Sequence, residues 1–128
     1  MQNLFKATLL ALVPLFSVAA FAAEMPFNQG QFDAALAAGK PVAVVFHADW
    51  CPTCRAQAPL LKELAQGPDL KALTLFVADF DNAHALEKSL GVTKQSTIVV
   101  FKTGKEIARS TGDTQRDNLA TLLHRAIS

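Results

Sequence analysis

The sequence has no strong excess of either charge. Twelve Lys and Arg residues stand against eleven Asp and Glu residues in 128, so there is no strong electrostatic field to gather nucleic acid. It also has no glycine-rich loop of the kind that cradles phosphate, no internal repeat and no low-complexity tract. These absences argue against a nucleic-acid-binding protein, a phosphate-binding loop and a repeat architecture.

Cysteine is scarce, with only Cys51 and Cys54 in the chain. A zinc site normally needs four ligands, and neither a second Cys pair nor a His-x3-His pattern is present. A purely structural disulfide between them would close a tiny loop, and short loops contribute least to stability. Redox chemistry is therefore the better explanation of this Cys-x-x-Cys spacing.

The first 22 residues, 1–22, have the pattern of a signal peptide. A single lysine precedes an apolar run at 7–16, and Ala20 and Ala22 are the small residues that a signal peptidase reads. An uncleaved membrane anchor is the alternative, but the apolar stretch contains a proline and is marginal for a span of about 20 residues. The sequence predicts an exported chain whose domain covers 23–128.

Just over half of the residues (51%) are hydrophobic and 18% are charged, which suits one packed domain. Periodicity predicts an α/β fold with a mixed sheet covered on both faces. Asn28 caps the first helix, and Thr114 with Asp117 resembles a capping box for the last. The expected strands lie at 42–46, 73–78, 97–101 and 106–110. Four helices are expected: the first after Asn28, the second from Pro52, the third at 83–90 and the last after Thr114.

The Cys51-Pro52-Thr53-Cys54 segment directly follows a β-branched strand and begins a helix. Exchange needs a thiolate, and the unpaired N–H groups and dipole at a helix start favour negative charge. We therefore assign attack on substrate to Cys51 and resolution of the mixed disulfide to Cys54. Pro52 removes one backbone donor near the sulfur, and Thr53 can add a hydroxyl donor.

Two neighbours are candidates for assisting the cysteines. Trp50 is either a packing residue or a partly exposed platform for substrate. His47, four residues before Cys51, either tunes the thiolate and assists proton transfer or packs partly buried.

These residues resemble the thioredoxin family. The shared features are the Trp-Cys-x-x-Cys signature at 50–54, Pro59, Asp81, Gly91-Val92, Phe101-Lys102-Thr103-Gly104 and Gly112, all in register. The resemblance implies a thioredoxin-like fold, a four-stranded core sheet flanked by helices. It also implies Cys51 as the attacking thiol, protein thiols and disulfides as partners, and no cofactor.

The chain departs from the family at three positions. The family has a cis-proline before the Thr of the loop that faces the cysteines, and here Ser96 precedes Thr97. A cis bond before a non-proline residue costs about 2.5–4 kcal/mol, so we expect a trans bond, a reshaped substrate-pairing loop and a hydroxyl near the sulfurs. Val45 and Val77 replace the buried Asp and the accompanying Lys, so water, His47 or Ser96 must help to deprotonate Cys54.

The leading hypothesis is a monomeric, periplasmic thiol:disulfide oxidoreductase. We favour a reductase recharged by a membrane electron carrier, with no metal site and no nucleic-acid partner, although direction does not follow from sequence. One alternative is a module handling a soft metal such as Cu(I), with His47 as third ligand, since losing the cis-proline could open the sulfurs. Another alternative is a non-enzymatic binding domain that kept the fold, but the presence of both cysteines argues against it.

Overall fold

The computed structural model describes Pro14 and residues 23–128. The predicted signal peptide lies outside the described residues, apart from Pro14, and stays a prediction. The elements are β1 (Ala23–Pro26), α1 (Gln29–Ala37), β2 (Val42–His47), α2 (Pro52–Gln66), η1 (Pro68–Leu70), β3 (Thr74–Asp79), α3 (His84–Leu90), β4 (Thr97–Lys102), β5 (Lys105–Thr111) and α4 (Arg116–His124). None of the helices among these residues is long and apolar enough to span a bilayer.

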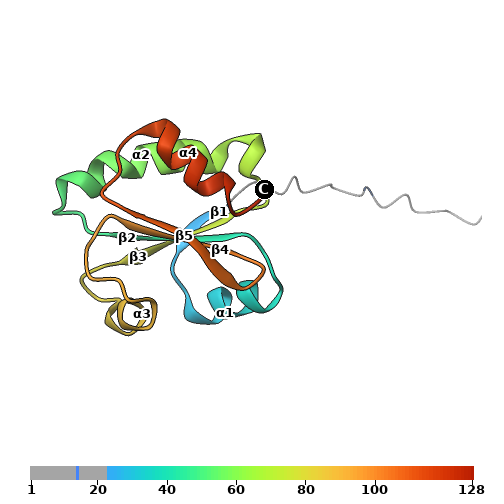
Figure 1. Ribbon diagram of the computed structural model, residues 1–128, viewed down its shortest axis with the longest axis horizontal. Coiled ribbons are helices and arrows are strands. Elements are labelled where there is room, and N and C mark those ends of the chain that lie inside the picture. Colours follow the sequence, from blue (N-terminus) through green and yellow to red (C-terminus); the bar gives the residue numbers. More distant parts are fainter. Residues whose placement is uncertain (1–13, 15–22) are drawn as a thin grey trace, which may run out of the picture.

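The five strands form one mixed sheet in the order β1-β3-β2-β4-β5. β1 and β2 each pair with β3 in parallel, whereas β4 runs antiparallel to both β2 and β5. Helices α2 and α4 cover one face of the sheet, and α1 and α3 cover the other (Figure 1). The expected α/β architecture with both faces covered is confirmed.

The alternating side chains of β2 build two cores, one on each face of the sheet. Ala43 and Val45 pack into the cluster beneath α2 and α4, and Val42, Val44 and Phe46 pack into the cluster beside α1 and α3. All five are at most 3% exposed, so the prediction of a strand buried on both faces is confirmed.

Two local features differ from the sequence-based expectation. β1 was not predicted, because four residues ending in proline carry little strand signal, and the parallel pairing with β3 supplies the stability. The predicted Thr114–Asp117 capping box is wrong. Helix α4 begins after Gln115, whose backbone N–H donates to Asp113 Oδ1 over 2.8 Å, so Asp113 organises this turn.

Candidate active site

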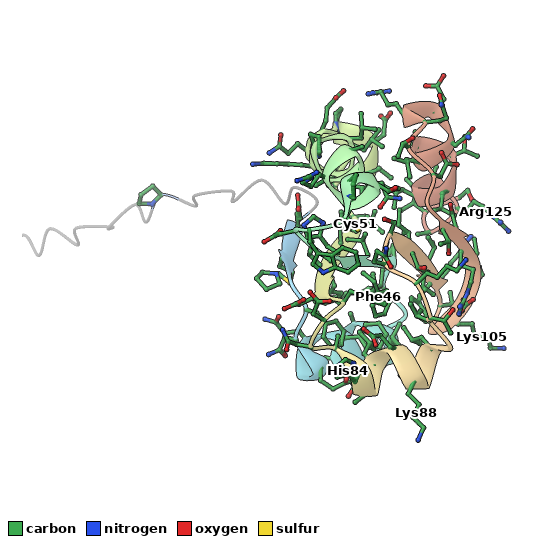
Figure 2. All side chains as sticks on the ribbon, turned by 90° about the vertical axis from the view of Figure 1, so that its left-hand side faces the viewer. Phe46, Cys51, His84, Lys88, Lys105 and Arg125 are labelled. Atoms are coloured by element: carbon green, nitrogen blue, oxygen red, sulfur yellow. The ribbon has the colours of Figure 1, made fainter. Side chains whose placement is uncertain are left out.

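The cysteines lie where β2 gives way to α2, on the face of the sheet that α2 covers. Cys51 is the N-cap residue of α2, and its Sγ accepts a hydrogen bond from the backbone N–H of Cys54 over 3.2 Å. Pro52 occupies the first turn, where its missing N–H leaves no bond unmade. Figure 2 shows Cys51 at the start of this helix and Phe46, a residue of β2, below it. The start of α2 thus points the Cys54 N–H at the Cys51 sulfur.

Ser96 reaches both sulfurs from the loop before β4. Its Oγ lies 2.9 Å from Cys54 Sγ and 3.4 Å from Cys51 Sγ. No peptide bond of the described residues is cis, so the bond before Ser96 is trans, as expected. Ser96 has a φ of 63°, a left-handed conformation that costs a non-glycine residue about 1–3 kcal/mol. Its backbone N–H donates to Phe46 O over 2.8 Å, which ties this strained loop to the end of β2.

The two thiols have opposite pKa shifts. Burial of Cys51 would raise its pKa, but hydrogen bonds from the Cys54 thiol, the Ser96 hydroxyl and the Cys54 N–H outweigh burial and lower it to about 7. Burial raises the pKa of Cys54, and so does its role as donor to the Cys51 thiolate. Cys51 is therefore the better nucleophile at neutral pH, and Cys54 stays protonated until it is needed.

Exposure separates Trp50 from the buried pair. Cys51 and Cys54 are 3% and 1% exposed, whereas Trp50 is 57% exposed. Among the described residues it is the large hydrophobic side chain that lies exposed on the surface. Its indole Nε1 donates to Asp81 Oδ2 over 2.8 Å, which holds the ring beside the cysteines. This position suits the substrate-platform interpretation rather than the packing one.

The remaining candidate residues lie around this centre with different contacts. His47 Nε2 lies 2.8 Å from Asp49 Oδ1, and the ring also lines a small cavity beside Cys54. Thr53 is half-buried, and among the described residues no hydrogen bond joins its hydroxyl to a sulfur. Thr97 Oγ1 donates to Lys94 O over 2.7 Å and contacts Thr111 Oγ1, so its hydroxyl holds the loop together, and no hydrogen bond of the described residues joins it to a sulfur.

Sequence reasoning missed Gln57, a buried residue one turn after Cys54. Its Nε2 donates to Ser96 O over 3.2 Å and to Asp113 O over 2.8 Å, which joins α2 to the Ser96 loop and to the turn before α4. At 1% exposure it is the only glutamine buried in the described chain. A polar residue on the apolar face of a helix was the available signal.

The soft-metal alternative gains no support from this geometry. Within residues 23–128 and Pro14, no group of three or more His, Cys, Asp or Glu side chains could hold a metal ion. Ser96 does not open the sulfurs as that hypothesis required, because its hydroxyl contacts both of them.

The thioredoxin family model, described as "Thioredoxin", matches residues 24–125. The chain belongs to the thioredoxin family. It is 34% identical over 96 residues to a thioredoxin of Chlamydia muridarum, covering 75% of this chain and 91% of that one. A thioredoxin of Mycoplasmoides gallisepticum is 30% identical over 96 residues, and the match covers 75% of this chain and 94% of that one.

Solved structures agree with the family. The crystal structure of Trxlp from Edwardsiella tarda has a TM-score of 0.77 and 35% identity, with 79% of this chain and 98% of that chain covered. Thioredoxin from Malassezia sympodialis has a TM-score of 0.72 at 21% identity, covering 82% of this chain and 93% of that chain, and shows the shared fold alone.

Membership of this family and the cysteine pair make the protein a thiol:disulfide oxidoreductase that acts on protein thiols and disulfides. The geometry suits an exchange in which the Cys51 thiolate attacks a substrate disulfide, displaces one substrate thiolate and forms a mixed disulfide. In that exchange Cys54 attacks Cys51 Sγ, which closes the Cys51–Cys54 disulfide and releases the second substrate thiolate, and the reverse sequence oxidises a substrate dithiol. The pKa order of the two thiols matches these successive roles.

Replacing Ser96 with alanine should raise the pKa of Cys51, because the thiolate loses one hydrogen-bond donor. A hydrogen bond to a charged group contributes roughly 1.5–3 kcal/mol, so we expect the pKa of Cys51 to rise by about one to two units. The ultraviolet absorbance of the thiolate, followed against pH, measures this directly. Ser89→Ala on α3 is the control, and an unshifted midpoint in Ser96→Ala would contradict the role of the hydroxyl.

Proposed function

We propose that this oxidoreductase is exported to the periplasm and works there as a reductase of protein disulfides, recharged by a membrane electron carrier. The observation that carries the direction is the Cys51 pKa of about 7. The remaining support comes from the sequence of residues 1–22 and from the position of the first strand.

The ionisation of the attacking thiol sets part of the reduction potential of the Cys51–Cys54 disulfide. A thiolate stabilises the reduced form by about 1.4 kcal/mol for each unit by which its pKa lies below the ambient pH. Strong oxidants of this fold have an attacking thiol with a pKa of about 3.5, which makes their disulfide easy to reduce. A pKa of about 7 leaves Cys51 only half ionised at neutral pH, so the reduced form gains little and the dithiol stays a good electron donor.

The export proposal rests on the signal-like pattern of residues 1–22. β1 begins at Ala23, so cleavage after Ala22 would remove no helix or strand of the described chain. Export would place the exposed Trp50 and the buried thiols in an oxidising compartment. A reductase there needs a continuous electron supply, which the proposed membrane carrier provides.

Trapping thiols in intact cells tests both parts of this proposal. Cells are quenched with acid, free thiols are alkylated, and the periplasmic fraction is analysed by intact mass. We expect a periplasmic chain that begins at Ala23 and carries two alkylated cysteines. A fully oxidised pool would overturn the reductase direction, and a cytoplasmic chain that retains residues 1–22 would overturn export.

A further inference from the structure

A small cavity lies behind Cys54, between α2 and the sheet. Its volume is about 20 Å³, which is enough for one water molecule. Cys54, Gln57, His47 and Glu24 supply its polar groups, and valine, alanine and leucine side chains complete the wall. A water molecule there would lie among several polar partners and beside the resolving thiol.

Gln57 has one buried atom that this water would satisfy. Both of its Nε2 hydrogen bonds go to backbone carbonyls, those of Ser96 and Asp113. Its Oε1 is buried and has no partner among the residues that the structure describes. An unpaired buried acceptor costs roughly 1–3 kcal/mol, and ordered water commonly fills such a role.

Glu24 connects the same cavity to the surface. It pairs with Leu75 in the β1–β3 register, so its side chain lies on the face of the sheet that α2 covers. It lines the cavity beside Cys54, and with Lys62 it also lines an open groove of about 600 Å³. Glu24, an exposed residue, therefore borders both the cavity beside Cys54 and the open groove.

Cys54 needs such an acceptor in order to act. Its raised pKa keeps it protonated at neutral pH, and only the thiolate attacks a disulfide. We propose that Gln57 Oε1 holds a water molecule in this cavity, and that this water carries the Cys54 proton to the Glu24 carboxylate during resolution. Gln57 is then a positioning residue, and Glu24 accepts the proton through the water.

The step balances without any further reagent. The Cys54 S–H proton passes to the water, which gives one of its own protons to Glu24. The new thiolate attacks Cys51 Sγ, the Cys51–Cys54 bond forms, and the bond from Cys51 to the substrate sulfur breaks. The departing substrate thiolate takes up a proton from solvent. The same step serves either direction of net exchange.

Few other titratable groups face Cys54. Cys51 approaches from the start of α2, His47 lines the cavity from β2, and Lys62 lies on the outer groove beside Glu24. His47 is therefore the competing titratable acceptor, although its Nε2 is already engaged with Asp49, and the Ser96 hydroxyl, 2.9 Å from Cys54 Sγ, is the competing relay.

The test measures resolution alone. The purified protein is converted to a Cys51 mixed disulfide with a chromogenic aromatic thiol, and release of that thiol is followed by stopped flow across a range of pH. In Glu24→Gln we expect release about a hundredfold slower at pH 7, the low end of general-base effects. The deficit should disappear as the pH approaches the pKa of Cys54, because the thiol then ionises unaided. A folding defect would slow release at every pH.

Further variants make the outcome decisive. Glu63→Gln on α2, an exposed carboxylate paired with Arg116, is the matched control and should match the parent protein. Gln57→Leu should show the same pH-dependent deficit as Glu24→Gln. An unchanged rate in either of these variants would overturn the proposal, as would a deficit found only in His47→Gln.

Discussion

Replacing Cys51 with serine should lower disulfide exchange at least about a thousandfold. A serine hydroxyl is not ionised at neutral pH and cannot form the mixed disulfide, so no later step can begin. In the structure Cys51 Sγ accepts a hydrogen bond from the Cys54 N–H and lies in contact with the Ser96 hydroxyl. Both groups stabilise a negative charge on the sulfur, which a neutral serine hydroxyl would not carry. Reduction of insulin with dithiothreitol as electron source measures the loss.

Cys54→Ser is the matched variant for this experiment. It keeps the attacking thiol but lacks the resolving one, so a mixed disulfide with substrate should accumulate and appear as an added mass. If Cys51→Ser accumulated the mixed disulfide and Cys54→Ser did not, the two roles would be reversed. That result would also contradict the opposite pKa shifts of the two thiols.

Replacing Ser96 with proline should lower the free energy of unfolding by roughly 3 kcal/mol or more. Proline fixes φ near −65°, which is incompatible with the φ of 63° at this position. Proline also lacks the N–H that donates to Phe46 O, which would leave that buried carbonyl short of its partner at a cost of about 1–3 kcal/mol. Urea denaturation of the reduced protein measures the change.

Ser96→Gly separates the backbone effect from the loss of the hydroxyl. Glycine adopts a positive φ without strain and keeps the N–H, yet it removes both contacts to the sulfurs. We expect the free energy of unfolding of Ser96→Gly to lie close to that of the parent protein and well above that of Ser96→Pro. If the two variants had equal free energies of unfolding, the loop would have to accept proline by rearranging. That result would contradict the requirement for a φ of 63° at this position.

Much of the fold could be predicted because its signals are local. The β-branched run of β2, Pro52 at the start of α2 and Gly91 at the end of α3 each specify their element through nearby backbone preferences. The reactive pair was predictable for the same reason, since Cys51 and Cys54 lie within one helical turn. β1 was not, because its four residues depend on the distant β3 for every hydrogen bond that makes them a strand.

The order of the elements from α1 to α4, and the position of the cysteine pair at a strand-to-helix junction, follow from local sequence alone. The sequence also placed Ser96 in the facing loop, but only the folded chain shows its hydroxyl in contact with both sulfurs, 42 and 45 residues away. Gln57 and Glu24 line the same cavity beside Cys54 because α2 packs over the β1–β3 register. The chemistry of the pair is local in sequence, whereas the groups around it meet only through long-range strand pairing and helix packing.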